Sequence, residues 1–181
     1  MLIKKGLFYT VFYLAIILLG SRAAFADATQ EYTVKAAMAL NLARFTDWPD
    51  SALIANNSVI NLCVLGDNVV QDAFLQMDQK KVGHRTLNVI YLSRLRNVDD
   101  CQVLYISGLE KNIIIQLLSE IKHKPILTIG EERTVVDYDG MVNLDTLSGK
   151  INIQINLDAT KQAGLTISAR VLKIATLVKS K

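Results

Sequence analysis

Cys63 and Cys101 are the residues of this 181-residue chain with the most definite chemistry. An even number of cysteines in an exported chain favours a disulfide, here one that closes a loop of about 38 residues. Cys63 lies early in one predicted strand and Cys101 at the start of another, so both are expected near the same end of a sheet. Two buried free thiols are the alternative, and a strained or exposed bond would act as a redox switch.

Other residue types that support catalysis are present without the partners they need. His84 and His123 are far apart and stand among polar residues, without the spacing of metal ligands. The stretch "DYDGMVNLD" resembles part of a calcium loop, but aligning Gly140 with the loop glycine puts Val135 at the first ligand position. Gly66 in "VLGDN" lacks the further glycines and the lysine of a phosphate-binding loop. The sequence therefore predicts no enzyme, no metal site and no cofactor.

The segment "NLARFTDWPD" contains the only tryptophan, Trp48. Large aromatic side chains more often fill a core than a site, so Trp48 is expected to pack under the sheet with Phe45. An exposed tryptophan beside Arg44 and Asp47 at a helix end would instead suit an interface hot spot. Arg44 and Trp48 are therefore the candidate partner-binding residues.

The first 26 residues have the layout of a secretory signal peptide. Lys4 and Lys5 precede an apolar stretch that is short for the roughly 20 residues of a membrane span, and Ala24 and Ala26 form an Ala-x-Ala pattern. We predict cleavage after Ala26, which leaves residues 27–181 as one exported domain. An uncleaved N-terminal anchor is the alternative.

Removal of the signal peptide changes the charge of the chain. The sequence has 20 Lys and Arg residues against 17 Asp and Glu. Lys4, Lys5 and Arg22 leave with the signal, so 20 − 3 = 17 basic residues remain and the mature chain is formally neutral. A nucleic-acid-binding protein would carry a basic stripe, and the mature chain has none, so no nucleic-acid partner is expected.

Helix-like and strand-like segments alternate along most of the mature chain. Apolar residues at helical spacing predict a helix over 31–48, which Pro49 is expected to end. Further helices are predicted over 69–77 and 108–123. Short apolar runs predict strands over 59–66, 85–92, 101–107 and 125–130.

The C-terminal third alternates apolar and polar residues on both sides of "SGK", which predicts a β-hairpin. The closing stretch "QAGLTISARVLKIATLVKS" returns to a helical period and predicts a helix. This order of elements predicts an α/β fold: a single three-layer domain with a mostly parallel sheet that ends in an antiparallel hairpin and is flanked by helices.

Six segments together resemble the YfiR-like family of periplasmic proteins, in the same order and spacing. They are "EYTVKAAMALNLARFTDWP", "LCVLGDN", "DCQVLYIS", "PILTIG", "DGMVNL" and "KINIQINLDATKQAGLTISARVLKIA". The resemblance implies a non-enzymatic inhibitor that binds the periplasmic domain of an inner-membrane diguanylate cyclase and lowers cyclic di-GMP. It also implies an outer-membrane lipoprotein that sequesters the inhibitor.

Two features of the chain limit what the resemblance transfers. Some relatives carry a second cysteine pair, and a Gly-Gly where this chain has Asp139-Gly140, so the role of that pair does not carry over. The sequence is compatible with a homodimer. The alternative function is a periplasmic ligand-binding or sensory module with another membrane partner, whose site would lie at the loops after Gly66, Ser107 and Gly130.

Overall fold

The computed structural model describes residues 29–53, 58–93, 95 and 97–181. The predicted signal peptide and its cleavage site lie outside these residues. No helix in the described part is long and apolar enough to cross a membrane.

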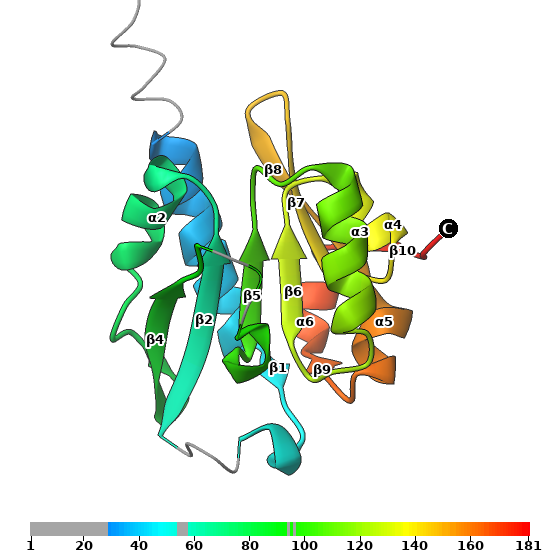
Figure 1. The fold of residues 1–181 in the computed structure, drawn as a ribbon. Helices are drawn as coiled ribbons and strands as arrows, with labels where there is room; N and C mark the ends of the chain where they lie inside the picture. The colour runs from blue at the N-terminus through cyan, green and yellow to red at the C-terminus, as the bar shows by residue number, and fades with distance from the viewer. Residues whose placement is uncertain (1–28, 54–57, 94, 96) are drawn as a thin grey trace, which may run out of the picture.

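Eight strands form the main sheet (Figure 1). They are β2 (Val59–Leu65), β3 (Lys81–Val82), β4 (Arg85–Tyr91), β5 (Val103–Ile106), β6 (Leu127–Gly130), β7 (Val142–Leu147), β8 (Lys150–Asn156) and β10 (Thr176–Val178). Their spatial order is β10-β8-β7-β6-β5-β2-β4-β3, with antiparallel pairing at β3–β4 and β7–β8 and parallel pairing elsewhere. The predicted mostly parallel sheet with an antiparallel hairpin is confirmed.

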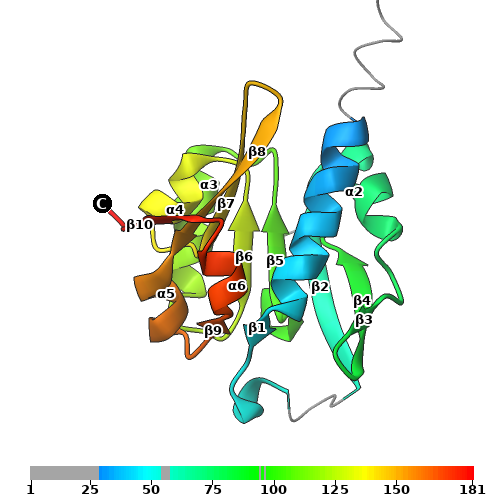
Figure 2. The ribbon, with the colours of Figure 1, turned by 180° about the vertical axis from the view of Figure 1, so that it is seen from behind.

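Helices cover both faces of this sheet (Figures 1 and 2). One face carries the helix over residues 29–44, here called the N-terminal helix, with α2 (Asn68–Leu75) and α6 (Ala169–Leu172). The other face carries α3 (Lys111–Glu120) and α4 (Arg133–Asp137), and α5 (Leu157–Gln162) follows β8 directly. The domain therefore has the three layers that the sequence predicts.

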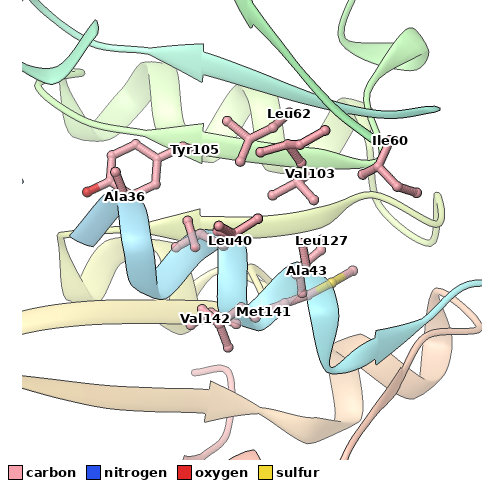
Figure 3. Packing of buried hydrophobic residues seen from close by; sticks show 14 of the residues in the cluster. Ala36, Leu40, Ala43, Ile60, Leu62, Val103, Tyr105, Leu127, Met141 and Val142 are labelled. Atoms are coloured by element: carbon pink, nitrogen blue, oxygen red, sulfur yellow. The ribbon is translucent and has the colours of Figure 1, made fainter. Parts of the chain in front are cut away.

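Two hydrophobic cores lie on the two faces, because successive side chains of a strand point to opposite sides. Leu62 of β2 belongs to the core under the N-terminal helix, whereas its neighbour Cys63 belongs to the core under α3. In Figure 3, Ala36 and Leu40 of the N-terminal helix point toward the strands of the first core. The small side chain of Ala36, which is fully buried, permits this close approach of helix and sheet.

The strand order reverses direction at β2. β4 lies on one side of β2, whereas β5, the next parallel strand along the chain, lies on the other side. In open α/β sheets, the crevice outside the carboxyl ends of the strands at such a position commonly receives ligands. In this chain the loops that begin at Gly66 and Ser107 lie there.

The first predicted helix is present, but it ends earlier than predicted. It stops at Arg44, four residues before Trp48, because the next residues form β1 (Thr46–Asp47), which pairs with β9 (Thr166–Ile167) in a small second sheet. The Thr46 hydroxyl also donates to the Leu42 carbonyl at 2.8 Å. Pairing with a distant strand therefore ends the helix before Pro49 can.

The predicted C-terminal helix is wrong. This stretch instead forms β9, α6 and β10. Gly164 after α5 has a φ of +73°, the left-handed conformation that ends helices, and the Ser168 side chain caps α6 by accepting from the Arg170 amide. The apolar residues Ile167, Val171 and Ile174 have helical spacing but lie in β9, in α6 and in the turn after α6, respectively.

Candidate functional site

Cys63 and Cys101 are joined by a disulfide with a Cα–Cα distance of 5.8 Å. Both cysteines are almost completely buried, in the core under α3. Cys63 lies in the middle of β2, opposite Leu104 of β5, rather than near the end of the strand as expected. The bond thus links β2 to the segment that leads into the adjacent strand β5, from inside the core.

A groove of about 700 Å³ opens beside this disulfide. Its wall includes three carboxamide side chains, Asn61, Asn88 and Gln102, on β2, β4 and the residue before β5. The Asn88 side chain donates to Asn61 Oδ1 at 2.9 Å, and the backbone N–H of Asn61 donates to Gln102 Oε1 at 2.9 Å. These groups form hydrogen bonds with one another across the strands, so the pairing of the strands accounts for their positions.

Arg44 and Trp48 line a second groove, of about 270 Å³, near the start of β2 and β4. Arg44 is exposed, and its Nε donates to the Lys81 carbonyl at 2.8 Å. Trp48 is half-buried against the first core, and its Nε1 donates to the Gln102 carbonyl at 3.2 Å. The structure thus places the two candidate contact residues together, with Trp48 also acting as a packing residue. Phe45, the expected companion of Trp48, is 37% exposed.

Trp48→Ala is expected to lower the free energy of unfolding by about 2 kcal/mol, less than a fully buried aromatic loses because part of the indole already faces solvent. Trp48→Phe keeps most of the packing and should cost about 1 kcal/mol, mainly for the lost hydrogen bond to Gln102. Urea unfolding followed by circular dichroism measures both. A Trp48→Ala protein within about 0.5 kcal/mol of wild type would show that the indole does not contribute to packing.

A buried charged cluster lies at the carboxyl edge of the sheet, next to the reversal in strand order. Lys35 of the N-terminal helix is 3% exposed, and its Nζ contacts Glu31 Oε1 at 2.6 Å and Glu131 Oε2 at 3.0 Å. The Tyr105 hydroxyl donates to Glu131 Oε1 at 2.6 Å, and Thr146 donates to Glu31 Oε1 at 2.7 Å. Four side chains from the helix, β5, β7 and the residue after β6 thus gather around the Lys35 ammonium group.

The charges in this cluster shift the pKa values of their neighbours. The hydrogen bond from Lys35, and then that from Thr146, lowers the pKa of Glu31. Burial acts to lower the pKa of Lys35, but its hydrogen bonds to Glu31 and Glu131 outweigh burial, so the pKa is raised. Burial and the Glu131 charge raise the pKa of Tyr105 far above its usual range. Lys35 is therefore a cation and Tyr105 a neutral donor near neutral pH.

The cluster lies where the sequence places a hypothetical ligand site, at the loops after Gly66, Ser107 and Gly130. Lys35 and Glu131 occupy this edge of the sheet, and the Tyr32 ring lies 5.3 Å from Lys35 Nζ. The cluster was not predicted from the sequence. One local feature of the sequence points to it. Glu31 and Lys35 lie four residues apart on the helix, a spacing that allows an ion pair, and Lys35 is followed by the buried Ala36.

The acidic turn that resembles part of a calcium loop is paired with lysines. Asp139 contacts Lys122 at 2.8 Å and accepts from Ser180 at 2.5 Å, while Asp137 contacts Lys181 at 2.6 Å. The hydrogen bond from Lys122, followed by that from Ser180, lowers the pKa of Asp139. These contacts hold the C-terminal residues after β10 against the turn. Among the described residues, no group of three or more His, Cys, Asp or Glu could hold a metal ion.

Comparison with known protein families identifies the family of this chain. The sequence model of the YfiR/HmsC-like family, DUF4154, matches residues 32–176. The matched range starts in the N-terminal helix and ends at the start of β10, so it includes both cores and the disulfide. The chain belongs to the YfiR/HmsC-like family of non-catalytic periplasmic regulators in cyclic di-GMP signalling.

Proposed function

We propose that this protein binds the periplasmic sensor domain of a diguanylate cyclase in the inner membrane and holds the cyclase inactive. The observation that carries the proposal is the family match over residues 32–176, since the family regulates cyclic di-GMP signalling from the periplasm. The predicted signal peptide would deliver the chain to that compartment. An outer-membrane lipoprotein that sequesters the protein would release the cyclase.

Inhibition of this kind requires differential binding. A protein that binds the active and inactive conformations of the cyclase equally well shifts nothing, however tightly it binds. Moving the cyclase from 1% to 99% inactive needs about a 10⁴-fold preference for the inactive conformation. The contact surface must therefore fit a feature of the cyclase that changes when the enzyme becomes active. Arg44 is exposed, and Trp48 retains part of its surface next to it, so these two residues remain candidates for contact.

Deletion of the gene is expected to raise intracellular cyclic di-GMP, and the wild-type gene should reverse the rise. The nucleotide is measured by mass spectrometry of cell extracts under several growth conditions. A matched control gene lacks codons 2–26. Its product stays in the cytoplasm, cannot reach the periplasmic domain, and should not reverse the rise. Unchanged cyclic di-GMP in the deletion strain would contradict the proposal.

A further inference from the structure

Apolar side chains are exposed along the outer side of the N-terminal helix and beside it. Val34 is 45% exposed and Phe45 is 37% exposed, and the half-buried Met38 lies between them, one turn after Val34. Ile174, just after α6, is 73% exposed, and Leu177 of β10 is 55% exposed. Figure 2 shows the N-terminal helix and α6 on the same face of the sheet. Exposed apolar residues gathered on one face indicate an interaction surface.

A groove of about 290 Å³ lies between these elements. We call it the apolar groove; its lining is Met38, Asn41, Leu42, Phe45, Ile153, Arg170, Val171 and Ile174. The N-terminal helix forms one wall, and the other is formed by α6 with Ile174. Ile153 of β8 also contributes to the lining. Leu177 extends the surface, because it pairs in register with Ile155 of β8, which belongs to the core under the N-terminal helix. The groove is distinct from the one that Arg44 and Trp48 line.

The positive charge at the apolar groove favours a partner with a carboxylate over a second copy of this chain. Among the described lining residues, Arg170 is the only charged one, and the exposed Lys173 directly precedes Ile174. A second copy of this chain bound through a two-fold axis would bring the same cations toward each other. An apolar segment with a carboxylate would satisfy both the apolar walls and Arg170.

We propose that the apolar groove is the docking site for the regulated partner, and that it receives an apolar segment of the periplasmic domain with a carboxylate opposite Arg170. This inference rests on the proposed function and adds the surface and the chemistry of the contact.

The test compares variants for binding to the purified periplasmic domain of the bacterium's diguanylate cyclase by isothermal titration calorimetry. Ile174→Asp places a carboxylate in the apolar groove and should weaken binding about tenfold or more. Arg170→Glu should weaken binding about tenfold, and more strongly at low salt, because it reverses the attraction. The matched control is Leu75→Asp. Leu75 is 57% exposed at the end of α2, on the opposite side of the N-terminal helix from α6 (Figure 2).

The outcomes separate the inference from the function on which it rests. Normal binding by Leu75→Asp and weak binding by Ile174→Asp, with both proteins as heat-stable as wild type, supports the apolar groove. Wild-type affinity in Ile174→Asp overturns the groove while the function stands. Absence of binding by the wild-type protein overturns the function, and the inference falls with it. Sedimentation that shows a wild-type dimer and an Ile174→Asp monomer with normal cyclase binding would assign the groove to self-association and overturn the proposal.

Discussion

Replacing Cys63 and Cys101 together by alanine is expected to lower the free energy of unfolding by about 4 kcal/mol. The bond joins residues 38 positions apart, so it removes many conformations from the unfolded chain. Both side chains are buried in the core between β2, β5 and α3, so the alanines also leave a small void there. Urea unfolding of the oxidised wild type and the double variant measures the difference, with the slopes compared because a cross-link changes the unfolded state.

Wild type unfolded in the presence of a reductant is the matched control. It should approach the stability of the double variant, since both lack the covalent link, whereas the reductant should not affect the variant. Thiol labelling of the native exported protein should find no free cysteine. A loss below about 1 kcal/mol, or labelling of both cysteines without reductant, would contradict the expectation.

The same variant tests whether the bond matters to signalling. Cys101 forms part of the wall of the 700 Å³ groove, and the disulfide ties the segment that leads into β5 to β2. If the double variant accumulates in the periplasm and still lowers cyclic di-GMP, the bond serves stability alone. If the accumulated variant fails to lower cyclic di-GMP, the link between these strands is needed for the inhibitory conformation.

The central strands could be predicted because burial on both faces of the sheet requires mostly apolar residues in them. β2, β5 and β6 are covered on both faces, so they appear as short apolar runs closed by turn residues. The C-terminal stretch could not be assigned in this way. There the apolar spacing of a helix is produced by β9, α6 and β10, whose partners β1 and β8 are distant in sequence. Helical period is a weak guide where short elements follow one another.

The residues of the candidate site likewise differ in how far local sequence could predict them. The disulfide was predictable from two cysteines in a chain with a predicted signal peptide. The packing of Trp48 was predictable because large aromatic side chains more often fill a core. The cluster around Lys35 was not predictable, because Glu131 lies 96 residues away and only the fold brings it to the helix. Locally, Glu31 and Lys35 have the spacing of an ordinary surface pair. The depth of Lys35 distinguishes the cluster, and depth follows from how the N-terminal helix packs on the sheet.

Glu131→Gln is expected to lower the free energy of unfolding by about 3 kcal/mol. The glutamine can still accept the hydrogen bond from Tyr105, so the variant mainly removes the negative charge next to the buried Lys35 ammonium. A buried charge that loses a partner keeps its desolvation cost and loses the attraction that offsets it. Glu31 alone cannot replace Glu131, because its side chain is 36% exposed, so its charge is partly screened by water.

Two further variants show whether the lost charge of Glu131 causes the loss of stability. Glu31→Gln removes the exposed partner and should cost about 0.5 kcal/mol. Lys35→Met combined with Glu131→Gln replaces the buried pair by uncharged side chains of similar size, so the double variant should be more stable than Glu131→Gln alone. Urea unfolding near neutral pH gives all the values. If Glu131→Gln is as stable as wild type, or if adding Lys35→Met lowers stability further, the ammonium is not held by Glu131. The packing of Ala36 and Leu40 must then hold the N-terminal helix to the sheet without help from the buried charges.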